Sequence, residues 1–96
     1  MSEEQLHKTI IDYLSSYKPE RIGLFGSFAR GEHDDGSDID ILVRFHETCS
    51  LLQLVRIEND LSDLIGIKVD LVTEGAIKNE RIKKSILKDL RVIYEA

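Results

Sequence analysis

The segment 38–45, DIDILVRF, alternates acidic and apolar side chains before it becomes mostly apolar. Successive side chains of a β-strand point to opposite faces of the sheet, so residues two positions apart share a face. Asp38 and Asp40 therefore share one face, while Ile39 and Ile41 lie on the other, towards a core. Such a strand requires a sheet that is covered on one face and carries two carboxylates on the opposite face.

Helical patterns alternate with short apolar segments along the rest of the chain. Ser2-Glu3-Glu4-Gln5 and Ser50-Leu51-Leu52-Gln53 have the spacing of a capping box, which starts a helix. The first of these helices is expected to end near Lys18-Pro19. The second carries the apolar stripe Leu54, Ile57, Leu61, Leu64 and Ile65, and it ends at Gly66.

A last helix is expected over 79–88, with Ile82, Ile86 and Leu90 on one face, and strands are expected over 21–25, 38–45, 68–72 and 92–96. This order of elements predicts an α/β (α+β) sandwich, in which helices flank a small mixed sheet. The order of the strands within that sheet does not follow from the sequence.

Composition limits the class of protein. The 96 residues carry 13 Lys and Arg against 18 Asp and Glu, a net charge of −5, and fit one small domain spanning 1–96. No apolar run is long enough to span a bilayer, the N-terminus has no signal-peptide stretch, and the single Cys49 excludes an internal disulfide. We therefore expect a cytoplasmic protein without a membrane partner. The acidic balance disfavours non-specific nucleic-acid binding.

The segment GSFARG, at 26–31, follows the first predicted strand. Gly26 allows the backbone to approach a ligand closely, and Ser27 is expected to be the N-cap of a short helix through Arg30. Backbone N–H groups at such a turn favour phosphate, and the Arg30 guanidinium adds charge-assisted hydrogen bonds to phosphate oxygens. The turn is therefore a candidate phosphate-binding element.

Asp70 is a candidate third carboxylate, because the apolar Val69 and Leu71 on either side of it face the core. If its strand neighbours the strand of Asp38 and Asp40, the three carboxylates converge. Two such charges about 4 Å apart repel by about 4 kcal/mol at an effective dielectric constant of 20. Bound Mg²⁺ offsets that cost and suits oxygen ligands, and Asp70 could accept a proton from an attacking hydroxyl. Phosphate donors beside paired carboxylates indicate phosphoryl or nucleotidyl transfer.

Other features have simpler interpretations. An Asp-x-Asp pair taken alone is often only the solvent face of a strand. The loop residue His33 is expected to be solvated, and so is the basic helix face within 78–91, although a partner-docking role for that face stays open. The segment 26–31 has the outline of a Walker loop, but Glu32 stands where that motif requires lysine.

Three segments, GSFARG at 26–31, SDIDILV at 37–43 and VDLV at 69–72, closely resemble the minimal nucleotidyltransferases, small members of the DNA polymerase β superfamily. The resemblance covers nearly the whole chain and implies the polymerase β-like core. It also implies that Ser27 holds the triphosphate of ATP, that Asp38 and Asp40 bind two Mg²⁺ ions, and that Asp70 completes the metal site and assists the acceptor hydroxyl.

Proteins of this type are typically encoded beside a HEPN-domain protein. The resemblance thus implies an antitoxin, in a hetero-oligomer with its toxin, that transfers AMP from ATP to a tyrosine of that toxin. The short chain leaves no room for an acceptor-binding domain, which independently favours a macromolecular acceptor. Two alternatives stay open: a non-catalytic binding module that neutralises a partner by complex formation, and nucleotidyl transfer to RNA or a small molecule.

Overall fold

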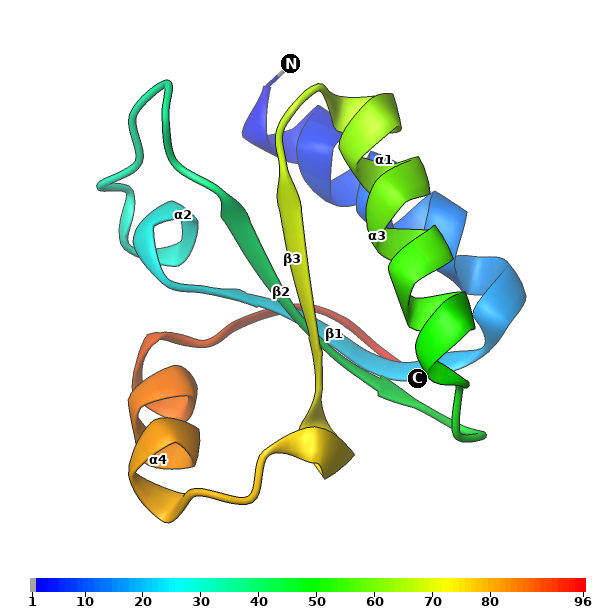
Figure 1. Ribbon diagram of the computed structural model, residues 1–96. Coiled ribbons are helices and arrows are strands. Elements are labelled where there is room, and N and C mark those ends of the chain that lie inside the picture. Colours follow the sequence, from blue (N-terminus) through cyan, green and yellow to red (C-terminus); the bar gives the residue numbers. More distant parts are fainter. Residues whose placement is uncertain (1) are drawn as a thin grey trace.

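Strand β2 (Ile39–Phe45) is an inner strand of a four-stranded sheet with the order β3-β2-β1-β4 in the computed structural model, which describes residues 2–96 (Figure 1). Strand β1 (Pro19–Phe25) runs antiparallel to β2 and to β4 (Arg91–Glu95), whereas β3 (Val69–Thr73) runs parallel to β2. The predicted mixed sheet flanked by helices is therefore confirmed.

The two predicted capping boxes start the two longest helices, α1 (Glu3–Leu14) and α3 (Leu51–Ile65). The hydroxyls of Ser2 and Ser50 accept from the backbone N–H groups three residues later, at 3.1 and 3.2 Å. In both boxes the glutamine side chain bonds back to the serine N–H. A 3₁₀ turn (Ser15–Tyr17) follows α1. No helix within residues 2–96 has both the length and the apolar character needed to cross a membrane.

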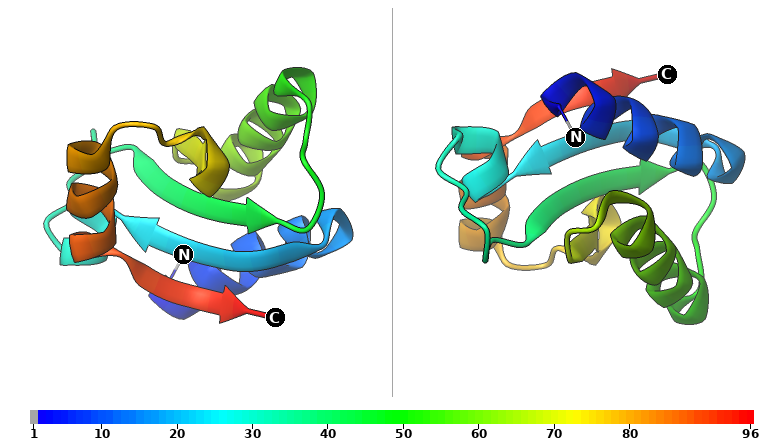
Figure 2. Two further views of the ribbon diagram at one scale, coloured as in Figure 1. Left: turned by 90° about the horizontal axis from the view of Figure 1, so that it is seen from below. Right: turned by 90° about the horizontal axis from the view of Figure 1, so that it is seen from above.

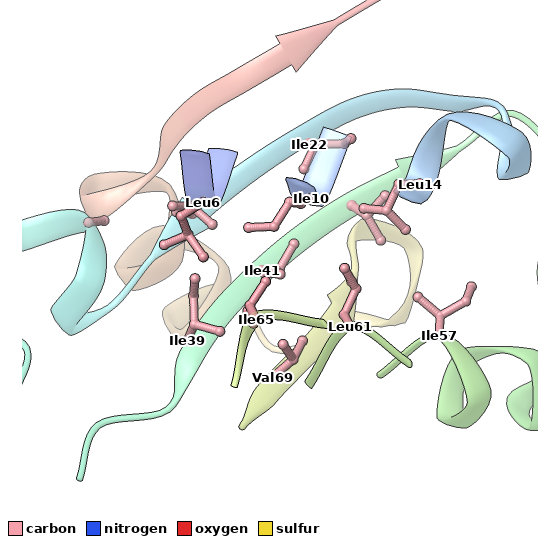
Figure 3. Packing of buried hydrophobic residues seen from close by; sticks show 13 residues of the cluster. Leu6, Ile10, Leu14, Ile22, Ile39, Ile41, Ile57, Leu61, Ile65 and Val69 are labelled. Atoms are coloured by element: carbon pink, nitrogen blue, oxygen red, sulfur yellow. The ribbon is translucent and has the colours of Figure 1, made fainter. Parts of the chain in front are cut away.

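Helices α1 and α3 cover one face of the sheet (Figure 2). Ile39 and Ile41 are fully buried there, as predicted. Within residues 2–96 no polar or charged side chain is buried. Figure 3 shows how the side chains of the core meet; the helices and strands contribute Leu6, Ile10, Leu14, Ile57, Leu61, Ile65, Ile22, Leu24, Val43 and Val69.

The prediction that Leu64 belongs to the buried stripe of α3 is wrong, because 54% of this residue is exposed. Ile57, Leu61 and Ile65 follow one another at spacings of four and form the buried row. One residue corresponds to about 100° of rotation around a helix, so Leu64 lies to the side of that row, at the edge that faces solvent.

Helix α4 (Glu80–Asp89) contacts the opposite face of the sheet. The Leu90 side chain lies against Gly23 of β1, at a place where any Cβ on Gly23 would collide with it. Of the predicted apolar face, Ile86 and Leu90 are half-buried, whereas Ile82 is 55% exposed, and no residue of α4 is fully buried. The physical reason is that Leu90, just after the last turn of α4, makes the close contact with the sheet, while the first turn of α4 stands clear of it.

Candidate active site

The turn between β1 and α2 (Ser27–Arg30) lies directly against a carboxylate. Gly26 has φ 73° and ψ −152°, a conformation that side chains oppose, and a Cβ at this position would collide with Oδ2 of Asp40. Glycine is thus required at this position for two reasons: its backbone conformation has a positive φ, and Asp40 leaves no space for a Cβ. The close approach joins the candidate phosphate-binding turn to strand β2.

Ser27 does not cap helix α2, contrary to the prediction. Gly26 is the N-cap and Ser27 is the first helical residue, and the cap carries no side-chain hydrogen bond. The positive φ of Gly26 turns the chain one residue earlier than a serine cap would. The Ser27 hydroxyl is therefore not used as a cap, which leaves it for another partner.

Asp40 and Asp70 occupy paired positions on neighbouring strands. The parallel register of β2 and β3 places Asp40 opposite Asp70, and Ile39 opposite Val69. The condition for converging carboxylates, adjacency of the two strands, is therefore met for this pair. Asp38 is exposed and precedes β2 by one residue, so the strand begins one position later than predicted.

The carboxylates act on one another electrostatically. Partial burial raises the pKa of Asp40 above the ordinary aspartate value, and the negative charges of Asp70 and then Asp38 raise it further. The positive charge of Arg30 lowers the same pKa. Ionised Asp40 is thus disfavoured by the protein itself, and a bound cation at this place would relieve the repulsion.

The donor set fits a hard divalent cation, because all three candidate side chains are carboxylates and such ions prefer oxygen ligands. Among residues 2–96, however, no three or more His, Cys, Asp or Glu side chains are already grouped to hold a metal ion. Asp38 lines a hollow together with Phe28 and Lys68, and this hollow includes neither Asp40 nor Asp70. The strand register thus pairs Asp40 with Asp70, and Asp38, one residue before β2, is close enough for its charge to raise the pKa of Asp40.

The guanidinium of Arg30 forms hydrogen bonds with two carboxylates, those of Glu32 and Asp89. Its Nε donates to Oε2 of Glu32 at 3.0 Å, and its Nη1 donates to Oδ2 of Asp89 at 2.7 Å. The sequence analysis did not single out Asp89. One signal was available, because an acidic residue at the C-terminal end of a helix opposes the helix dipole and needs compensation.

His33 is exposed, as predicted, but it has a specific contact. Its ring stacks on Phe28, with centroids 4.0 Å apart and an interplanar angle of 5°. This stack joins α2 to the loop that leads to Asp38, so the loop is tied to the candidate phosphate-binding turn.

The basic residues in and just before α4 match the predicted solvated face. Their side chains are exposed, and within residues 2–96 none of them forms an ion pair; they are Lys78, Arg81, Lys83, Lys84 and Lys88. The prediction was wrong for Arg91, which lies in β4 and forms an ion pair with Glu3 at 3.5 Å.

The family model described as nucleotidyltransferase domain matches residues 7–93, a span that includes the turn and all three candidate carboxylates. The chain belongs to the nucleotidyltransferase domain family. The predicted family and enzyme class are thereby confirmed.

Two relatives of this nucleotidyltransferase are similar over most of their length. A Methanocaldococcus jannaschii protein whose name contains the words protein adenylyltransferase is 56% identical over 84 residues, which are 88% of this chain and 84% of the relative. The protein adenylyltransferase MntA of Thermococcus cleftensis is 45% identical over 73 residues, which are 76% of this chain and 71% of the relative.

Solved structures show the same fold. One named as a minimal nucleotidyltransferase has a TM-score of 0.79 at 32% identity and covers 95% of each chain. A toxin–antitoxin structure with AMP-PNP has a TM-score of 0.85 at 24% identity, covering 94% of this chain and 73% of the other. A tri-AMPylated Shewanella oneidensis HEPN toxin in complex with its MNT antitoxin has a TM-score of 0.82 at 21% identity, covering 99% and 74%. Because the last two structures are less than 25% identical to this chain, their similarity shows a shared fold only.

Proposed function

We propose that this nucleotidyltransferase transfers AMP from ATP to a tyrosine hydroxyl of a partner HEPN-domain toxin and thereby acts as its antitoxin. The observation that carries the proposal is the pair Asp40 and Asp70 beside the Gly26 turn, an arrangement suited to a nucleoside triphosphate with its metal ions. The acceptor class is supported by the relatives named as protein adenylyltransferases and by the fold shared with the antitoxin of an AMPylated HEPN toxin.

Each candidate residue has a role in this proposal, and that of Arg30 is to donate hydrogen bonds to the phosphate oxygens of ATP. The Gly26 backbone and the Ser27 hydroxyl bind the triphosphate, and Asp38, Asp40 and Asp70 would hold Mg²⁺, two ions in all. When bound, the Mg²⁺ ions neutralise negative charge that develops on the phosphate oxygens. Because the reaction consumes ATP, we place it in the cytoplasm.

The transfer is a displacement at the α-phosphorus of ATP. The acceptor oxygen forms a bond to the α-phosphorus while the bond between that phosphorus and the bridging oxygen to the β-phosphorus breaks, so that pyrophosphate leaves. Asp70 accepts the proton of the acceptor hydroxyl. Its side chain suits this role, because Asp70 is exposed and stands beside Asp40.

The test uses as acceptor the HEPN-domain protein that we expect to be encoded next to this chain. Both proteins are incubated with ATP and Mg²⁺, the intact mass of the acceptor is measured, and the modified residue is located by peptide mapping. We expect mass increases in steps of one AMP on a tyrosine, and none with the Asp38→Asn variant.

Unchanged acceptor mass together with a stable complex would contradict the proposal and favour the non-catalytic binding module. AMP found on RNA or a small molecule, with the HEPN protein unmodified, would keep the chemistry and overturn the acceptor.

A further inference from the structure

One ion pair joins helix α4 to the turn of the candidate active site. Arg30 of α2 and Asp89 of α4 are 59 positions apart in the chain, yet Nη1 of Arg30 donates to Oδ2 of Asp89 at 2.7 Å. The Asp89 side chain is 24% exposed, compared with 66% for Glu32, the second carboxylate on Arg30. The Asp89 pair is therefore the less screened of the two.

Asp89 stands at an unfavourable place for an acidic residue. It is the last residue of α4, where the helix dipole disfavours negative charge and favours residues such as the neighbouring Lys88. A residue that conflicts with its local setting needs a compensating partner elsewhere in the fold. Arg30 supplies that compensation, so the pair is a specific tertiary contact.

Arg30 keeps hydrogen-bonding capacity beyond these two contacts. A guanidinium has five N–H donors, and the carboxylates engage Nε and one donor of Nη1. Within residues 2–96, Nη2 has no hydrogen bond. Arg30 is one turn from the candidate site, because its backbone N–H donates to the Gly26 carbonyl at 3.1 Å and Gly26 lies against Asp40. Donors thus remain for an anion beside Asp40.

We propose that Asp89 is a positioning residue for ATP: it holds Arg30 beside the Gly26–Ser27 turn, so that the remaining guanidinium donors bind a phosphate of ATP. The inference rests on the proposed function, because it assumes that this site binds ATP. It adds α4 to the nucleotide site, although no residue of α4 need touch the nucleotide.

The test measures the Kd for ATP with Mg²⁺ by calorimetry on the full chain, without an acceptor. Asp89→Asn is expected to raise Kd roughly tenfold, within the range of charge-assisted contacts. Asp89→Glu is expected to recover part of that loss, and Arg30→Ala to weaken binding at least as much as Asp89→Asn. The matched control is Asp12→Asn, which removes the exposed ion pair with Lys8 on α1, and it is expected to leave Kd within about twofold.

A double mutant separates positioning from a merely structural role. If Asp89 acts through Arg30, adding Asp89→Asn to Arg30→Ala causes no further loss of ATP affinity. In transfer assays, Asp89→Asn should raise the KM for ATP while kcat at saturating ATP stays nearly unchanged. Thermal unfolding of each variant checks that the fold is kept, and Asp89→Glu serves if Asp89→Asn does not fold.

Wild-type affinity in Asp89→Asn, or a further loss when it is added to Arg30→Ala, would overturn the inference and leave the proposed function standing. A wild-type chain that binds no ATP would overturn the proposed function itself, and the inference with it.

Discussion

The two faces of the sheet are built on opposite principles. The face beneath α1 and α3 is an apolar core, to which β2 contributes Ile39, Ile41 and Val43. On the other face the same strand presents Asp40, beside Asp70 of β3. The alternating pattern of a single strand thus places core residues on one side and a candidate site carboxylate, followed by the buried Leu42, on the other.

The second face also holds charges that the chain neutralises only in part. Arg21 of β1 forms an ion pair with Glu74, in the turn after β3, whereas the positive charge of Arg30 only partly offsets the negative charges that act on Asp40. Just after helix α4, Leu90 packs against Gly23 on this face. The comparison teaches that the apolar face is completed by the chain itself, whereas on the charged face the negative charges of Asp70 and Asp38 still act against that of Asp40.

The largest expected effect is on the charged face. Asp40→Asn keeps the shape of the side chain but removes its charge, so AMP transfer should fall at least about 1000-fold, equivalent to about 4 kcal/mol. Without metal, the variant should be no less stable than the wild type, because a repulsion between carboxylates is removed. Initial rates of transfer and thermal unfolding without Mg²⁺ check both parts; a variant with full activity would contradict the proposed site.

The adjacent residue tests the apolar face. Ile41→Ala empties a fully buried position and should lower the free energy of unfolding by about 3 kcal/mol. Val72→Ala on β3 is the matched control, because Val72 is only partly buried, and it should cost about 1 kcal/mol. Urea denaturation measures both, and equal losses would show that the two sites are packed alike.

A smaller effect is expected where the two covering helices meet. The Tyr13 hydroxyl donates to Oδ2 of Asp60 at 2.6 Å, so Tyr13→Phe should cost about 1 kcal/mol at neutral pH. Burial and this hydrogen bond raise the pKa of Tyr13, so its contribution is complete below the ordinary tyrosine pKa and is lost at strongly alkaline pH. Unfolding curves of the wild type and of Tyr13→Phe should therefore differ at pH 7, and the difference in unfolding free energy should disappear at strongly alkaline pH. A difference that does not change with pH would show that ionisation of Tyr13 plays no part.

The smallest effect is expected on the basic face of α4. Lys84 is exposed and, within residues 2–96, has no ion-pair partner, so Lys84→Glu should change stability by less than about 0.5 kcal/mol. If this face is only solvated, transfer to the HEPN-domain acceptor should also stay unchanged. The matched variant is Arg56→Glu on α3, another exposed basic residue. A loss of transfer confined to Lys84→Glu would show instead that α4 docks the partner.

Local sequence was sufficient for much of the fold. The two capping boxes predicted the starts of α1 and α3, and the alternation in 38–45 predicted that Ile39 and Ile41 are buried, although it did not predict burial of Leu42 on the face of Asp40. These features depend on neighbours within a few residues, and therefore the pattern predicts them directly. The prediction for Ser27 was wrong, because the backbone of Gly26 turned the chain one residue earlier.

What the sequence determined by itself is the set of elements and the chemical types at the site: a glycine-serine turn and carboxylates that alternate with core residues. Only the tertiary structure decided that β3 lies parallel to β2, so that Asp70 meets Asp40 across thirty positions of chain. Only the tertiary structure decided that Asp89 holds Arg30. The physical reason is that both contacts depend on how α3 and α4 return the chain to the sheet, and that return is governed by the packing of whole faces.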